Sequence, residues 1–172
     1  MIDVKQFVTL VIRPTLLELG LYTPAAERLL LGTALVESNL TWLAQTPRGP
    51  ALGVYQMEPA THDDIWIHWL ARKPVWNARV RSFSRAIGTP GFPRPVAQEL
   101  VTNMAYATVM TRMHYYRRPF GMPTEHSDWA LAQIWKQHYN TRLGAGRPEE
   151  FVRRLQAYPL DMFGPYPAPT SR

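Results

Sequence analysis

Apolar residues recur every three or four positions along most of the chain, a spacing that predicts a mostly α-helical fold. Asp3 can cap a first helix, which Pro14 should kink and Gly20 should end. Thr23, followed directly by a proline, predicts the start of a second helix that runs to about residues 39–40. Two adjacent faces of this helix are largely apolar, one with Leu29, Thr33, Val36 and Leu40 and the other with Leu30, Ala34 and Glu37. We therefore expect the helix to be buried.

The rest of the chain alternates between helical pattern and turn signals. Further helices are predicted from Pro59 to the residue before Pro74, over 75–87, over 95–118, over 128–139 and from Pro148 onward. Proline and glycine content predicts loops at 46–50 and 89–95, and the pattern of 51–57 fits a short extended stretch. The segment 95–118 is the longest and carries little charge, which predicts a central helix packed on several sides.

The length of 172 residues fits one domain with a sizeable core. We assign residues 1–158 to this domain and the proline-rich residues 159–172 to a C-terminal tail that is extended or loose. No apolar run reaches the roughly 18–20 residues that a membrane-spanning helix needs. The N-terminal segment has no secretory pattern, so we expect the protein to stay in the cell that makes it, or to leave by lysis or within a particle.

The chain has no cysteine, which excludes disulfides, thiolate catalysis and cysteine-based zinc sites. Its net charge of +6 favours an anionic partner such as nucleic acid, bacterial cell wall or phospholipid. The basic residues look dispersed apart from short pairs such as Arg117-Arg118, without a basic tract interleaved with aromatics. We therefore predict no nucleic-acid partner.

Glu37 is the one charge on the apolar faces of the second predicted helix, near Leu30, Ala34 and Leu40. Loss of hydration raises the pKa of a buried carboxylate. A carboxylic acid that stays protonated near neutral pH can donate its proton to a leaving group, as cleavage of a glycosidic bond requires. The alternative interpretation is that Glu37 pairs with an arginine or is solvated at the helix end.

The residues around Glu37 follow a distinctive order, which is Glu37-Ser38, a loop with Gly49, the stretch Gly53-Val54-Tyr55-Gln56-Met57, then Pro59 and Thr61. This order resembles the signature of soluble lytic transglycosylases and their relatives in the lysozyme-like superfamily. A third element of that family resembles Trp129 to Gln133 followed by Tyr139-Asn140, with a longer insert here. The resemblance covers residues 25–146. It implies a lysozyme-like, mostly α domain with a cleft between the Glu37 region and the long helix.

The resemblance also implies a role for each matched residue. Glu37 would be the catalytic acid at the bond between N-acetylmuramic acid and N-acetylglucosamine, and then the base that closes a 1,6-anhydro ring. Substrate binding would fall to Ser38, Gly53, Tyr55, Gln56, Tyr139 and Asn140. Gly53 would let the backbone approach the sugar, Gln56 would hydrogen-bond an acetamido or hydroxyl group, and Tyr139 would hydrogen-bond Glu37. Tyr55 and Glu58 depart from the family pattern, which affects the expected shape of the sugar subsites.

Most of these residues also have a structural interpretation. The Ser38 hydroxyl can belong to a helix end, Gly53 can serve a positive φ, Gln56 can satisfy loop backbone, and Tyr139 can be a core aromatic. Trp42 is the best candidate to stack on a sugar, or it caps the core of a small lobe. Asp63 and Asp64 are expected as favourable charges in the first turns of a helix, or as water-holding groups in a hydrolytic enzyme. His62 and His68 are six positions apart and do not share a helix face, so we predict no metal and no cofactor.

We expect a peptidoglycan-cleaving muramidase of the lytic transglycosylase type, which acts on glycan strands of the bacterial wall. The setting we expect is a phage protein made in the host cytoplasm, either a virion-associated lytic enzyme or an endolysin. The alternative is a phage tail or baseplate protein that keeps a lysozyme-like fold with little or no activity and contacts other virion proteins. Exposure of Glu37 in an open cleft would distinguish the enzyme from the structural protein. Cleavage of a related polymer such as chitin is a third interpretation.

Overall fold

In the computed structural model, which describes residues 1–45, 49–85, 94–123, 127–140 and 145–166, the chain begins with a helix that changes type twice. α1 (Val4–Gln6) continues as the π-helical η1 (Phe7–Ile12) and then as α2 (Arg13–Leu19). The side chain of Asp3 accepts a 2.8 Å hydrogen bond from Gln6 N, as predicted. The π segment ends two residues before Pro14, which cannot donate a backbone hydrogen bond, so the predicted interruption is a change of helix type. Gly20 ends the helix with a φ of 76°.

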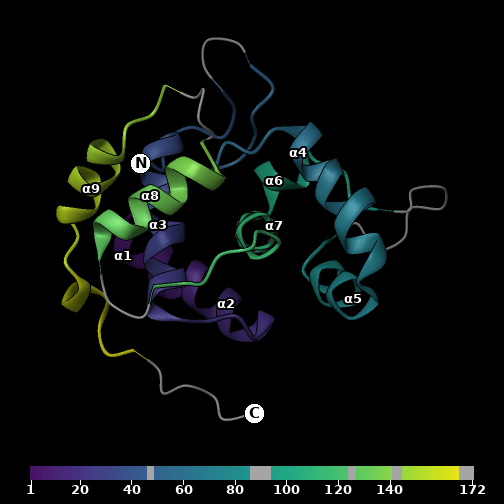
Figure 1. Ribbon diagram of the computed structural model, residues 1–172, viewed down its shortest axis with the longest axis horizontal. Helices are drawn as coiled ribbons and strands as arrows, with labels where there is room; N and C mark the ends of the chain where they lie inside the picture. Colours follow the sequence, from purple (N-terminus) through teal and green to yellow (C-terminus); the bar gives the residue numbers. More distant parts are fainter. Residues whose placement is uncertain (46–48, 86–93, 124–126, 141–144, 167–172) are drawn as a thin grey trace.

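The second predicted helix is α3 (Pro24–Ser38), and its bounds agree with the sequence pattern. Thr23 Oγ1 accepts a 3.0 Å hydrogen bond from Ala26 N, and Asn39 ends the helix in the left-handed region. α3 is buried on almost all sides, because α7, α8 and α9 pack around it (Figure 1). Helix α9 (Pro148–Gln156) comes so close that a Cβ at Gly32 would lie 2.2 Å from the Phe151 ring.

The predicted helix over 95–118 is wrong at its start. The chain forms a short α6 (Glu99–Thr102), leaves helical geometry at Asn103, and begins again as α7 (Met104–Tyr116). The Asn103 side chain caps α7 by accepting a 3.0 Å hydrogen bond from Tyr106 N. Its amide nitrogen also donates a 2.8 Å hydrogen bond to Phe83 O, and this tertiary contact holds the break in place. The expected central position does hold for α7, which contacts α2, α3, α5 and α6.

One side of the molecule is formed by the segment that runs from α4 to α5 (Figure 1). α4 (Pro59–Asp64) continues into π-helical η2 (Ile65–Trp69) and η3 (Leu70–Arg72), a 3₁₀ turn, so the predicted helix from Pro59 is confirmed with changes of type. α5 (Pro74–Ser82) is shorter than predicted. The predicted residues 86–87, as well as parts of both predicted loops (46–48 and 89–93), lie outside the described residues.

The stretch 51–57 forms a tight turn instead of an extended strand. Leu52 and Met57 exchange backbone hydrogen bonds of 2.9 and 3.0 Å, which close the turn, and both Gly53 and Gln56 have positive φ. Within the described residues there is no β-strand, only isolated bridges. The described helices also include none that is long and apolar enough to cross a membrane.

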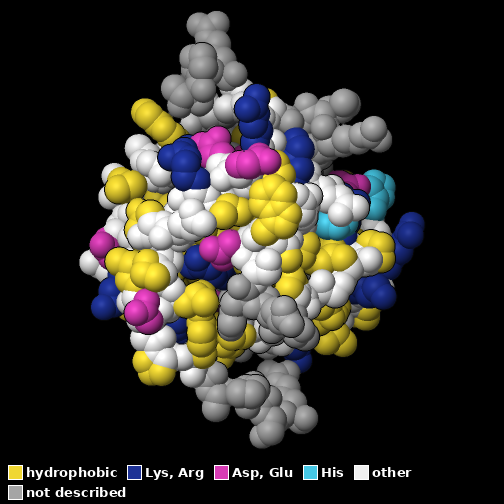
Figure 2. Space-filling model, turned by 60° about the vertical axis from the view of Figure 1, so that its left-hand side comes forward, with side chains coloured by type: hydrophobic (Ala, Val, Ile, Leu, Met, Phe, Trp, Pro, Cys, Tyr) yellow, Lys and Arg dark blue, Asp and Glu magenta, His cyan; other side chains and the backbone are white. Residues whose placement is uncertain are grey.

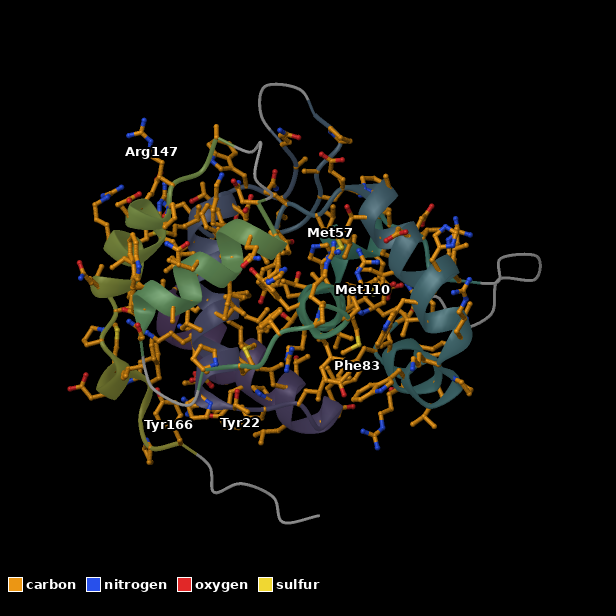
Figure 3. All side chains as sticks on the ribbon, in the orientation of Figure 1. Tyr22, Met57, Phe83, Met110, Arg147 and Tyr166 are labelled. Atoms are coloured by element: carbon orange, nitrogen blue, oxygen red, sulfur yellow. The ribbon has the colours of Figure 1, made fainter. Side chains whose placement is uncertain are left out.

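The remaining helix, α8 (Asp128–His138), begins where predicted, with Ser127 Oγ accepting a 3.2 Å hydrogen bond from Ala130 N. The first part of the predicted tail is ordered against the body. It contains η4 (Leu160–Phe163), whose Phe163 is buried, and Arg13 Nη1 donates a 3.0 Å hydrogen bond to Phe163 O. Figure 3 shows Met57, Met110 and Phe83 in the middle of the molecule around α7, whereas Arg147 extends outward.

Candidate active site

A cavity of about 800 Å³ lies where the ends of α3, α7 and α8 meet the start of α4. Its walls come from segments far apart in the sequence. Figure 3 shows Met57, one of the lining residues, between the ends of α8 and α4. The lining residues are Glu37, Trp42, Gln45, Ala51, Gln56, Met57, Glu58, Ala60, Thr61, Asp64, His114, Arg117, Arg118, His138, Tyr139 and Asn140. Exposed residues among them, including Trp42, Glu58 and Arg118, open the cavity to solvent. The predicted position of a cleft, between the Glu37 region and the α7 helix, therefore agrees with the structure.

Glu37 is the next-to-last residue of α3, and the left-handed backbone at Asn39 and Leu40 turns the chain away immediately after it. Its carboxyl group is thereby left at the wall of the cavity. Burial raises its pKa from the ordinary value of 4.5 to about 7, against the opposing effect of a hydrogen bond from Trp135. The Trp135 Nε1–H donates this bond to Glu37 Oε1 at 2.9 Å. No ion pair joins Glu37 to any residue in the described ranges, so the arginine-pairing interpretation does not hold there.

A second carboxylate, Asp64, lines the same cavity, and its pKa is shifted in the opposite direction. Arg117 Nη1 donates a hydrogen bond to Asp64 Oδ2, and this contact lowers the pKa of Asp64. His114 Nε2 lies 2.9 Å from His138 O, and because a carbonyl only accepts, this ring nitrogen carries the proton. His114 Nδ1 is then free to accept from Arg117 Nη2 at 3.3 Å. Burial, together with the nearby arginines, lowers the pKa of His114 to about 4, so this imidazole is neutral at pH 7.

Two of the expected substrate-binding side chains are buried away from the cavity. Ser38 is 2% exposed, and its hydroxyl donates a 2.6 Å hydrogen bond to Val54 O, which ties the end of α3 to the 51–57 turn. Tyr55 is 1% exposed, and its hydroxyl lies 3.1 Å from Thr108 Oγ1. Neither side chain lines the cavity, so their expected part in substrate binding would be indirect, and for Ser38 it would consist of holding the cleft through its hydroxyl. The hydrophobic pattern could not show which way the turn directs Tyr55.

Both the backbone conformation and the packing at position 53 require a glycine. Its φ is 73°, and a Cβ at this position would lie 2.3 Å from Leu100 O. The expected close approach is therefore to the backbone of α6, and the positive-φ interpretation is the correct one. Gln56 lines the cavity, but its Nε2 donates a 2.8 Å hydrogen bond to Gly53 O. Among the described residues, none donates a hydrogen bond to its side-chain oxygen, so this oxygen can accept one from a ligand.

The expected hydrogen bond from Tyr139 to Glu37 is replaced by a different arrangement. Tyr139 lines the cavity, but its hydroxyl donates a 2.8 Å hydrogen bond to Tyr55 O. Trp135, one helical turn earlier on α8, orients Glu37 instead. A buried indole N–H needs an acceptor, but the sequence does not indicate which one. Asn140 lines the cavity and accepts a 2.9 Å hydrogen bond from Lys136 Nζ.

Trp42 is 55% exposed and lines the cavity, which is the position that stacking on a sugar requires. Gly146, at the end of the matched region 25–146, allows the close packing of Trp135, because a Cβ there would lie 2.4 Å from the indole Cη2 atom. Among the described residues, no group of three or more histidine, cysteine, aspartate or glutamate side chains could hold a metal ion.

Comparison with known proteins adds no relatives. No family model, no curated protein and no solved structure matches this chain.

Proposed function

We propose that this protein is a peptidoglycan-cleaving muramidase of the lytic transglycosylase type, with Glu37 as its acid and base. The observation that carries the proposal is the Glu37 carboxyl group, which has a pKa near 7 and borders an open cavity. An acid with this pKa is partly protonated at neutral pH and can transfer its proton to a glycosidic oxygen. The Trp135 N–H holds one carboxyl oxygen, and the other would act on the substrate.

The reaction uses Glu37 twice. Its carboxyl proton moves to the glycosidic oxygen as the bond from C1 of N-acetylmuramic acid to that oxygen breaks. The C6 hydroxyl of the same sugar then bonds to C1, and its proton moves to the Glu37 carboxylate. The product is a 1,6-anhydro ring, no water is consumed, and Glu37 is protonated again. The neutral His114 and the Asp64–Arg117 pair would form the polar wall that binds the glycan.

Hydrolysis is the second candidate reaction, and Asp64 is the observation that favours it. A hydrolytic glycosidase needs a second carboxylate that is ionised when the first is protonated. Glu37 and Asp64 line one cavity, and their environments shift their pKa values in opposite directions. In that reaction Asp64 would accept a hydrogen bond from the attacking water. The phage setting of either enzyme is a prediction from the sequence resemblance.

Digestion of purified peptidoglycan, with products read by mass spectrometry, tests the proposal. The wild-type protein should release anhydro-muropeptides, and Glu37→Gln should release none. Glu149→Gln is the matched control, because it makes the same chemical change at an exposed residue of α9. Products with a reducing muramic acid would assign hydrolysis instead. A folded wild-type protein that releases nothing would contradict the proposal and favour the structural phage component.

A further inference from the structure

Outside the cavity, four side chains form a row that the proposed cleavage does not use. The Arg112 guanidinium carbon lies 5.4 Å from the centroid of the Tyr116 ring, and the Tyr116 and Trp76 ring centroids are 4.9 Å apart. The Arg79 guanidinium carbon lies 5.4 Å from the Trp76 ring centroid. We name these residues, in the order Arg112, Tyr116, Trp76 and Arg79, the arginine–aromatic row. It crosses from α7 to α5, which contact each other (Figure 1).

Arg112 is a buried cation without a counter-charge. The residue is 6% exposed, and its Nε atom is buried without a hydrogen-bond partner. Among the described residues, none forms an ion pair or a hydrogen bond with its guanidinium, and burial lowers its pKa to about 10. A buried charge without a partner is costly, whereas a bound anion would compensate it. The described part of the chain therefore supplies no anion to this guanidinium, and an oxyanion from outside the chain would supply one.

The surrounding segment has the charge that attracts such an anion. Residues 65–98 contain six lysine or arginine residues and no aspartate or glutamate, so this segment carries the whole net charge of +6. Arg72, Lys73 and Arg79, which lie in its described part, form no ion pair there. By contrast, the face of the molecule shown in Figure 2 carries acidic and basic side chains next to one another. Along the sequence this segment concentrates cations near Trp66, Trp69 and Trp76, which the interpretation of a dispersed pattern missed, and one of them, Arg94, is paired with Asp63.

We propose that the arginine–aromatic row binds a phosphate group carried on a saccharide or polyol chain of a bacterial envelope. A guanidinium group presents paired N–H donors that match phosphate geometry. The Tyr116 ring contacts Arg112, Trp69 and Trp76 and is 40% exposed, so stacking of a nucleic-acid base on it is the alternative that the DNA probe below tests. A phosphate needs only the guanidinium edge. The choice of an envelope polymer rests on the proposed function, in which the row would hold the enzyme on its substrate layer.

Binding measurements on the full chain test this site with four probes: poly(glycerol phosphate), a phosphorylated lipopolysaccharide core oligosaccharide, the same oligosaccharide without phosphate, and single-stranded DNA with a matched number of phosphates. We expect one of the first two to bind, and which one binds identifies the source of the phosphate. Arg112→Met should weaken that binding by about tenfold or more. Arg153→Met is the control, because Arg153 is 73% exposed on α9. Binding that survives in Arg112→Met, no binding of either phosphorylated probe, or equally tight binding of DNA would overturn the proposal.

The stability of the unliganded variant separates binding from folding. Because Arg112→Met removes an unpaired buried charge, its melting temperature should equal or exceed that of the wild type. A lower melting temperature would assign Arg112 a structural role and overturn the site. Glu37→Gln should keep the binding and lose the cleavage. Loss of peptidoglycan cleavage alone would therefore count against the proposed function, and loss of phosphate binding alone against the row.

Discussion

The indole N–H of Trp135 donates a 2.9 Å hydrogen bond to Glu37 Oε1 and joins the end of α3 to α8. This bond favours the ionised carboxyl group, whereas burial favours the protonated one, and burial has the larger effect. The pair therefore sets both the orientation and the pKa of the carboxyl group. Trp135 is itself fixed by stacking on Phe151 of α9, with ring centroids 5.6 Å apart.

Trp135→Phe should lower kcat by about tenfold or more, because the carboxyl group loses the donor that orients it. The pKa of Glu37 should rise further, since the lost bond stabilised the ionised form. The high-pH limb of the kcat/KM profile should accordingly move to higher pH. Trp66→Phe is the control, because it removes a 2.8 Å indole hydrogen bond to Tyr106 away from the cavity. An unchanged profile in Trp135→Phe would contradict the assigned role.

Glu37→Gln should stabilise the protein at alkaline pH and leave its stability unchanged in acid. The folded-state pKa of Glu37 is about 7 and its ordinary value is 4.5, so the folded protein binds the proton more tightly. The stability that this proton contributes is fully present below about pH 4.5 and is lost as pH rises through 7. Thermal unfolding of both proteins from pH 4 to 9 should show their melting temperatures diverge over this window. Parallel curves would show that the carboxyl group is not buried.

Gly53→Ala should destabilise the fold by about 2–3 kcal/mol, because the new Cβ meets Leu100 O in addition to the cost of a positive φ. Gly121→Ala is the control, because its φ is not positive and a Cβ there would meet no atom within 4 Å. Its cost should be less than about 1 kcal/mol. Urea denaturation measures both free energies of unfolding. Equal losses would contradict the prediction, because they would show that the contact with α6 and the positive φ are both relaxed at little cost.

Ser38→Ala should cost about 1–3 kcal/mol of unfolding free energy, because Val54 O loses its buried donor and Leu40 N its acceptor. The residue does not line the cavity, so KM for peptidoglycan should stay close to the wild-type value while the free energy of unfolding falls. Ser82→Ala, at an exposed serine of α5, should be near neutral in the same urea titration. A large rise in KM with full stability would restore the original expectation of substrate contact.

The parts of this protein that the sequence alone determined are those with local causes. The starts of α3, α8 and α9 follow from Thr23, Ser127 and Pro148, because a cap or a proline acts within one helical turn. The burial of α3 and the raised pKa of Glu37 likewise follow from the apolar stretch 29–40, in which Glu37 is the one charged residue.

Contacts between distant segments could be decided only by the tertiary structure. Trp135, not the expected Tyr139, bonds Glu37, because the packing of α8 on α3 selects which donor reaches it. The long helix breaks at Asn103, where a hydrogen bond to Phe83 outweighs local helix propensity. Arg112 and Arg79 lie along one row of aromatic rings only because α7 packs on α5. Side-chain direction and partner choice are properties of packing, and periodicity along one segment does not contain them.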